Sequence, residues 1–192
     1  MDEHAEKGKP FPATLLRRAA VALLLSAAPL LVRADPAPAP AGSSVYDLPF
    51  VWVSDRDERL RLDTWRGHPV VITMAYSSCG RVCVMTLHKL EELQATADRE
   101  NRAVEFVVVG YNPLLDTPAA WASYRSKHKL DRSNWHFLTG APDDTHALAR
   151  MLGIDYWLYE EHVMHDFKIV LLSPDGRPQK SLDWNDRNGA LF

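Results

Sequence analysis

Two apolar runs constrain the fold of this chain more than any other feature. Residues 70–75 and 104–109 are mostly β-branched or otherwise apolar, which is typical of strands buried on both faces. Residues 84–99 follow the first run and repeat apolar side chains at close to helical spacing, and a helix signal follows the second run. Buried strands joined by helices predict a parallel pair in an α/β sheet, with helices on both faces.

Further signals extend this pattern toward both ends. Residues 50–53 with 59–62, and residues 168–172 with 179–182, enclose turn residues and predict terminal β-hairpins. The second hairpin makes the central sheet mixed.

Helix boundaries and one more short strand are marked between these hairpins. Asp116, Thr117 and Pro118 form a helix-capping signal. Residues 135–138 predict a short strand. Asp143 or Asp144 is expected to cap a helix that ends before Gly153.

The only two cysteines, Cys79 and Cys83, stand between the first apolar run and its helix. If that helix begins near Cys79, four-residue spacing places both sulfurs on one side. The helix N-terminus and Arg81 favour the thiolate form. Such a pair can form a disulfide or bind a soft ion such as Cu(I). The arrangement resembles that of thioredoxin, with one more residue between the cysteines.

An inert structural disulfide is the alternative for this pair. A loop this short removes only about 2 kcal/mol of unfolded-state entropy, against nearly 5 kcal/mol for a loop of about 100 residues. A stabilising disulfide would join more distant segments, so the spacing favours a redox pair or a metal site.

The N-terminal region predicts export. Arg17 and Arg18 precede an apolar run of about 14 residues, and Ala34 ends a signal-peptidase motif. We expect residues 1–34 to be a signal peptide; an uncleaved membrane anchor is the alternative, although the run is shorter than the roughly 20 residues that span a bilayer. Residues 35–44 are a Pro- and Ala-rich linker, and residues 45–192 form one domain.

Charge excludes one class of partner. Residues 1–34 hold five basic and three acidic residues, so 17 basic and 22 acidic residues remain in the rest of the chain. No basic stripe is present, and we therefore expect no nucleic-acid binding.

Several motifs in a fixed order resemble the Sco/SenC family. They are the Cys79–Cys83 pair, residues 107–118, residues 135–140, and His165 ahead of residues 171–176. The resemblance implies a thioredoxin-like fold, and copper binding through the two cysteines and a distal histidine. It also implies a role in assembling the copper site of cytochrome c oxidase, and some members act as thiol-disulfide reductases.

The resemblance assigns the distal histidine to His165, eleven residues before Gly176. We expect His165 to open a strand beside the cysteine-bearing strand, so that its ring can reach the sulfurs. His162 is the rival ligand, and Met85 and Met164 are expected to fill core space. Surface or loop positions are expected for the remaining histidines: His4, His68, His88, His128, His136 and His146.

The chain departs from the family pattern at several positions. Gly80 and Arg81 stand where proline and an acidic residue are common, and Val84 and Asn112 replace an expected proline and aspartate. Arg81 brings a positive charge near the metal position, which weakens cation binding and favours a redox role. Few residues remain for the closing helix of the family.

These observations predict a periplasmic, thioredoxin-like, monomeric copper protein. Cys79, Cys83 and His165 are the predicted copper ligands, and the two cysteines also form a reversible dithiol. The expected partner is the copper-site subunit of a membrane oxidase, or another periplasmic copper protein. The alternative is an enzyme, a thiol-disulfide oxidoreductase that needs no metal.

Overall fold

The computed structural model describes residues 43–78, 82–159 and 162–192, and within them one mixed sheet of seven strands and a separate two-stranded ribbon. The strands are β1 (Trp52–Ser54), β2 (Arg59–Leu60), β3 (Val70–Ala75), β4 (Glu105–Gly110), β5 (Trp135–Thr139), β6 (Tyr156–Tyr159), β7 (His162–His165), β8 (Ile169–Leu172) and β9 (Pro178–Leu182). The helices are α1 (Val82–Arg99), α2 (Pro118–His128) and α3 (Pro142–Leu152), with short 3-10 turns η1 (Val45–Asp47) and η2 (Leu62–Trp65).

The sheet has the order β2-β1-β5-β4-β3-β8-β9. β3, β4 and β5 are parallel, whereas β1 and β8 join them antiparallel. The predicted α/β class, mixed sheet and two hairpins are confirmed, and the predicted parallel pair is part of a parallel trio. Parallel neighbours need crossover connections, and α1 and α2 supply them.

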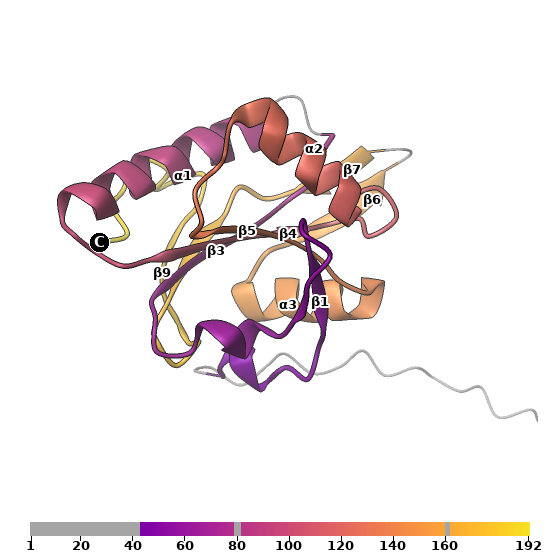
Figure 1. Ribbon diagram of the computed structural model, residues 1–192, viewed down its shortest axis with the longest axis horizontal. Helices are drawn as coiled ribbons and strands as arrows, with labels where there is room; N and C mark the ends of the chain where they lie inside the picture. Colours follow the sequence, from indigo (N-terminus) through magenta and orange to yellow (C-terminus); the bar gives the residue numbers. More distant parts are fainter. Residues whose placement is uncertain (1–42, 79–81, 160–161) are drawn as a thin grey trace, which may run out of the picture. The chain divides into compact units, whose positions relative to one another are not determined.

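Successive side chains of the central strands point alternately into two apolar cores, one on each face of the sheet. Ile72 and Val107 belong to one core with Leu148 of α3. Val71 and Val108 belong to a second core with Leu90 of α1. Figure 1 shows α1 and α2 on one side of the sheet and α3 on the other. The apolar runs are continuous because helices cover both faces of the sheet, so that side chains on either face are buried.

The N-terminal caps of α2 and α3 differ in how well the sequence predicted them. Thr117 caps α2 as predicted, since its side chain accepts a hydrogen bond from the Ala120 N–H at 3.2 Å. The predicted cap of α3 was wrong: Pro142 is the first helical residue, so Ala141 is the N-cap, and Asp143 and Asp144 lie in the first turn. Proline fixes the helical φ at that position, and the cap therefore lies two residues before Asp143 and three before Asp144.

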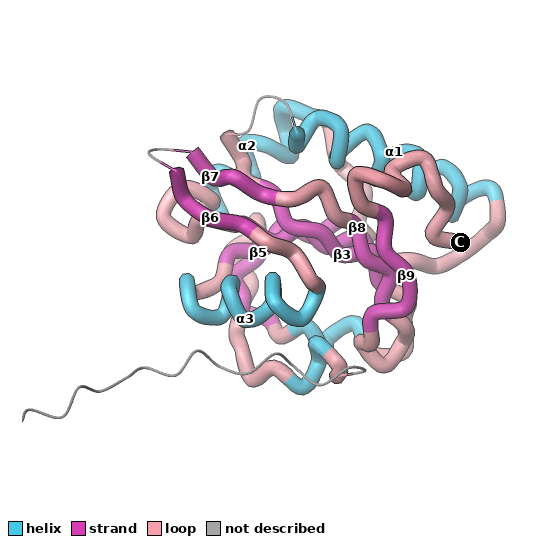
Figure 2. The backbone as a smooth tube through the Cα atoms, turned by 180° about the vertical axis from the view of Figure 1, so that it is seen from behind, coloured by secondary structure: helices cyan, strands magenta, loops and turns pink. Residues whose placement is uncertain are grey.

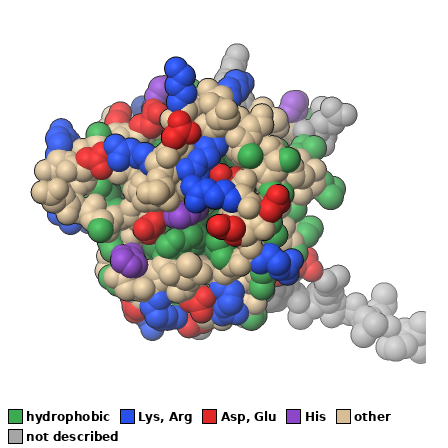
Figure 3. All heavy atoms as spheres, viewed as in Figure 1, with side chains coloured by type: hydrophobic (Ala, Val, Ile, Leu, Met, Phe, Trp, Pro, Cys, Tyr) green, Lys and Arg blue, Asp and Glu red, His purple; other side chains and the backbone are tan. Residues whose placement is uncertain are grey.

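Gly153 ends α3 in the left-handed conformation, with φ of 64°, as the sequence predicted. The β6–β7 ribbon that follows was not predicted, and it lies apart from the β8–β9 hairpin (Figure 2). Residues 183–192 form bends and turns, and Leu191 is buried in the α1-side core. On the face seen in Figure 3, Lys and Arg side chains intermingle with Asp and Glu side chains.

A buried arginine ties α2 to the sheet. Arg125 donates to the Trp135 carbonyl at 2.8 Å and to the Arg132 carbonyl at 2.6 Å. Its guanidinium also pairs with Asp55 at 3.2 Å, and the two side chains are only 10% and 5% exposed. A buried charge that loses its partner is strongly destabilising.

We therefore expect Arg125→Met to lower the free energy of unfolding by about 3–5 kcal/mol, because it leaves the Asp55 carboxylate buried and unpaired. The control is Arg132→Met, which breaks a pair with Asp98 whose side chains are 55% and 43% exposed, and which should cost no more than about 1 kcal/mol. Urea unfolding measures both values. Equal losses in the two variants would contradict this account of the fold.

Candidate functional site

The two cysteines belong to the connection between β3 and α1. Cys79 lies outside the described residues, as does the predicted helix start beside it, so the approach of the two sulfurs remains a prediction. Cys83 is the second residue of α1, and its backbone therefore lies in the first helical turn. The N–H groups of that turn form the positive end of the helix dipole, which favours a thiolate at this position.

His165 lies against the chain segment that leads into the cysteines. It is half-buried at the end of β7, and its ring centroid is 4.7 Å from that of Tyr111. The Tyr76 ring meets it edge-on at 6.0 Å. Tyr76 directly follows β3 and stands three residues before Cys79. The fold thus brings the predicted histidine to the strand end from which the cysteine loop departs.

Pairing between β3 and β8 produces this placement. The strands run antiparallel with Thr73 opposite Ile169, and the Thr73 hydroxyl donates to the Lys168 carbonyl at 2.7 Å. Residues just before Ile169 therefore lie beside the carboxyl end of β3. His165 ends β7 and does not open the strand beside β3, which corrects the expected position; its ring reaches the strand end from the short connection between β7 and β8.

A backbone contact fixes the orientation of the His165 ring. Its Nδ1 lies 2.9 Å from the Asp166 carbonyl oxygen. A carbonyl can only accept, so Nδ1 carries the proton and Nε2 carries the lone pair of the neutral ring. This is the tautomer in which Nε2 can bind a metal ion, and ligating histidines commonly use their other nitrogen in this way.

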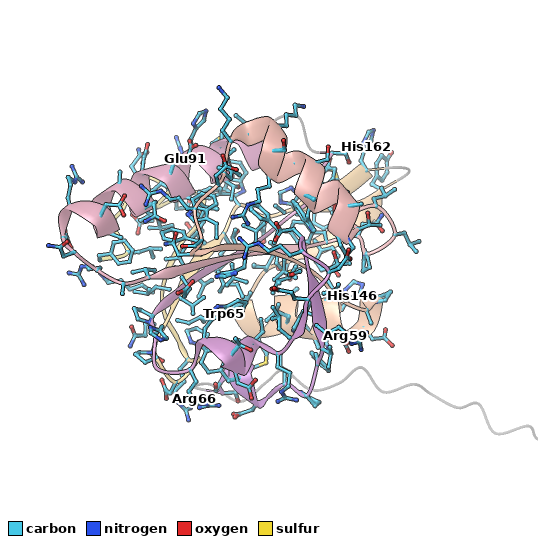
Figure 4. All side chains as sticks on the ribbon, viewed as in Figure 1. Arg59, Trp65, Arg66, Glu91, His146 and His162 are labelled. Atoms are coloured by element: carbon cyan, nitrogen blue, oxygen red, sulfur yellow. The ribbon has the colours of Figure 1, made fainter. Side chains whose placement is uncertain are left out.

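His162 lies in the same strand but differs in position. Residues 162–165 are extended and not helical, and His162 pairs across the ribbon with Tyr159. Because strand side chains alternate between faces, His162 and His165 point to opposite faces of the ribbon. His162 is exposed at the outer end of β7 (Figure 4).

Three other described histidines contact other side chains, and His146 does so beside the β6–β7 ribbon, where Tyr156 lies opposite His165. His136 contacts Glu105 at 2.8 Å, His88 pairs with Glu91 at 3.4 Å, and His146 stacks on Tyr156 at 4.6 Å between centroids. Among the described side chains, no three His, Cys, Asp or Glu groups gather as a metal site requires, and the sulfurs of the predicted site are not part of that set.

The expected core role of two methionines was wrong. Met85 is 42% exposed and Met164 is 44% exposed. Met164 precedes His165 in β7, where alternation turns it to the other face of the ribbon.

Asp116 has a role that the capping signal did not reveal. Thr117 caps α2, whereas Asp116 is fully buried and bonds to the ends of two strands. Its Oδ1 accepts from the Ser77 N–H at 2.7 Å and from the Ser77 hydroxyl at 2.9 Å. Its Oδ2 accepts from the Asn112 N–H at 2.9 Å. Burial raises the pKa of Asp116, and these hydrogen bonds oppose part of that rise.

An apolar groove adjoins His165. It has a volume of about 410 Å³, and its lining includes Tyr111, Leu114, Tyr156 and Trp157. Tyr111 contacts both the His165 ring and the Tyr156 ring, at 4.7 and 4.8 Å between centroids, so groove and histidine share a wall. Leu114 is 84% exposed and Trp157 is 55% exposed. Exposed apolar groups gathered in this way are typical of interaction sites.

A mixed sheet with a cysteine pair after its first parallel strand defines the class as a thioredoxin-like α/β protein. The SCO1/SenC family profile matches residues 38–191. The chain therefore belongs to the SCO1/SenC family. No curated protein matches it by sequence.

Solved structures with the same fold are similar over most of this chain. A SCO1/SenC family lipoprotein from Bacillus anthracis is 24% identical, with a TM-score of 0.65, over 72% of this chain and 85% of that one. Copper-bound ScoI from Arabidopsis thaliana is 22% identical, with a TM-score of 0.65, over 77% and 90%. Copper-bound yeast Sco1 is 18% identical, with a TM-score of 0.62, over 77% and 82%.

Across the part of the chain that the structure describes, none of the helices has the length and apolar character to cross a bilayer.

We expect neutral His165 to be held in the Nδ1–H tautomer, because the Asp166 carbonyl accepts its proton. Long-range ¹H–¹⁵N spectra of the reduced protein above pH 8 measure this directly. The exposed His162 is the internal control and should show no such preference for Nδ1–H. Identical nitrogen shifts for the two rings would mean that the carbonyl does not orient His165.

Proposed function

We propose that this chain binds one copper ion as cargo through Cys79, Cys83 and His165. It then delivers the ion to, or reduces the cysteines of, the copper-site subunit of a respiratory oxidase. Family membership supports this proposal. Relatives from Arabidopsis, Bradyrhizobium japonicum and yeast are solved with copper bound. Another relative, BsSco, belongs to the Sco family of cytochrome c oxidase assembly proteins.

The observation that carries the proposal is the contact of His165 with Tyr76. Tyr76 leads from β3 into the loop that contains Cys79. A histidine remote in sequence is thus held where the cysteine loop starts, with Nε2 as its lone-pair nitrogen. Because this juxtaposition joins chain segments that only tertiary structure brings together, it supports one site built from both.

The donor set fits copper chemically. Two thiolates suit Cu(I), and an added neutral imidazole supplies the nitrogen that Cu(II) prefers. The rings of Tyr76 and Tyr111 flank the imidazole and restrict its rotation. A site that accepts both oxidation states with little rearrangement suits a protein that takes up copper and then releases it.

The groove beside His165 supports transfer to a protein partner. Tyr111 forms a wall of both features, and the exposed Leu114 and Trp157 belong to the groove. An acceptor that covers this surface would also approach the copper ligands, so that the ion could pass directly between proteins.

Compartment and domain limits are part of the same proposal. A signal at residues 1–34 would export a domain of residues 45–192, preceded by the linker, to the periplasm. An uncleaved signal would keep it membrane-anchored. The relative from Bacillus anthracis is a lipoprotein, which supports action at a membrane surface.

A second candidate function is thiol-disulfide exchange without metal. The position of Cys83 in the first turn of α1 favours it, because this position stabilises a thiolate. The reaction converts both cysteines to a disulfide while a disulfide of the partner is reduced to two thiols.

Copper titration of the reduced protein separates these functions. We expect one copper per chain and an intense thiolate-to-Cu(II) absorption band. His165→Ala should lower Cu(II) affinity by more than the roughly 10- to 100-fold typical of outer-shell changes, and should lower Cu(I) affinity far less. The reason is that two thiolates alone satisfy Cu(I).

The matched control for this titration is His162→Ala, three residues away on the opposite face of the ribbon. It should leave both affinities unchanged. If His162→Ala removed the Cu(II) band and His165→Ala did not, the ligand assignment would be wrong. If wild-type protein bound no copper, the metal-independent function would take first place.

Alkylation rates across pH report on the cysteines themselves. We expect at least one thiol with a pKa below the free value of about 8.5, because of the helix N-terminus and Arg81. The same titration of the Cys83→Ser variant assigns the value to one sulfur. Thiol pKa values at or above that reference in the reduced protein would indicate an inert structural pair.

A further inference from the structure

Three parallel strands end at one buried carboxylic residue. The side chain of Asp116 bonds to Ser77 after β3 and to Asn112 after β4. Its backbone carbonyl accepts the hydroxyl proton of Thr139 at the end of β5. The residue is 0% exposed. Thus Asp116 joins the carboxyl ends of β3, β4 and β5, which form the edge of the sheet beside His165.

The contact with Ser77 holds the chain in place beyond the end of β3. Ala75 is the last residue of β3, and its carbonyl accepts a hydrogen bond from the N–H of Tyr111, the residue after β4, at 3.0 Å. Two residues further along, the Ser77 N–H donates a hydrogen bond to the Asp116 carboxylate at 2.7 Å. Ser77 stands two residues before Cys79, so the Asp116 side chain holds the described chain just before the cysteine loop.

The packing around Asp116 leaves it little freedom. A Cβ built on Gly110, the last residue of β4, would lie 2.6 Å from the Asp116 Cβ. Glycine at that position therefore allows the aspartate to approach the strand. Such close packing, with three hydrogen bonds to two oxygens, holds the carboxylate in one orientation.

Helix capping does not account for this residue. Thr117 supplies the cap of α2, through its bond with the Ala120 N–H. The Asp116 side chain instead turns back toward residues 77 and 112. Neighbouring residues thus divide two tasks, and a variant of each can separate them.

We infer that Asp116 is a positioning residue for the cysteine pair. Through Ser77 it fixes the direction in which the chain leaves β3, so that Cys79 meets Cys83 and His165. The inference rests on the proposed function, since it assumes that these three residues act together. It assigns Asp116 no contact with copper.

The chemistry of the bonds requires a carboxylate. Both oxygens accept from backbone N–H groups, one from Ser77 and one from Asn112. An asparagine side chain offers one acceptor and one donor, so in either orientation its NH₂ group faces a backbone N–H. Asp116→Asn therefore preserves size and breaks one of the two backbone contacts.

The test compares three variants of the full chain. Asp116→Asn removes a backbone contact, and Ser77→Ala removes only the hydroxyl bond at the partly exposed end of the pair. Thr117→Ala is the matched control, because it weakens α2 without touching the Asp116 side chain. Two quantities are measured: the Cu(II) dissociation constant, and the equilibrium constant for reduction of the Cys79–Cys83 disulfide by dithiothreitol.

We expect Asp116→Asn to weaken Cu(II) binding by about tenfold or more, as changes behind metal ligands commonly do. It should also shift the dithiothreitol equilibrium toward the dithiol, because a looser Cys79 meets Cys83 less often. Ser77→Ala should give smaller changes in the same directions, and it decides the matter if Asp116→Asn does not fold. Thr117→Ala should move neither quantity.

Two results would overturn the inference. One is that Asp116→Asn and Ser77→Ala leave both quantities unchanged, which leaves the proposed function intact. The other is that Thr117→Ala changes them equally, which would make the effect one of general stability. If wild-type protein binds no copper, the proposed function fails and the disulfide equilibrium alone decides: a shift in Asp116→Asn without one in Thr117→Ala supports the positioning role, and no shift refutes it.

Discussion

One buried carboxylate, that of Asp116, ties together the strand ends on which the candidate site depends. It holds Ser77 and Asn112 through hydrogen bonds of 2.7 to 2.9 Å. A charge kept out of water is costly unless such donors surround it, and burial accordingly raises the pKa of this group. The arrangement therefore exchanges some stability for a fixed geometry at the carboxyl edge of the sheet. His165 reaches the same edge through the pairing of β8 with β3.

Much of the fold follows from local patterns in the sequence. The runs that became β3 and β4 are apolar on both sides, because α1 and α3 cover opposite faces. Thr117 and Gly153 mark helix ends through chemistry that operates within a few residues. The position of Cys83 near a helix start could be predicted from the sequence for the same reason. His165 was predicted as a ligand from the resemblance to a family motif, since a lone histidine carries no such local signal.

Three features were missed, each for a different physical reason. Ser77 lies 39 residues before Asp116, and nothing near either residue indicates their bond. The β6–β7 ribbon includes exposed tyrosine, tryptophan and methionine side chains, so its pattern does not alternate as that of a half-buried strand does. The start of α3 was misplaced because two aspartates competed with a proline, and the fixed φ of Pro142 decided the boundary.

We propose that this fold brings His165, Cys79 and Cys83 to a single copper ion. X-ray absorption at the copper edge, on reduced protein loaded with one equivalent of Cu(II), measures the donor set most directly. The account predicts a first shell with two sulfur donors and an imidazole nitrogen. A first shell of oxygen and nitrogen donors alone would contradict it, because copper would then be bound without either cysteine.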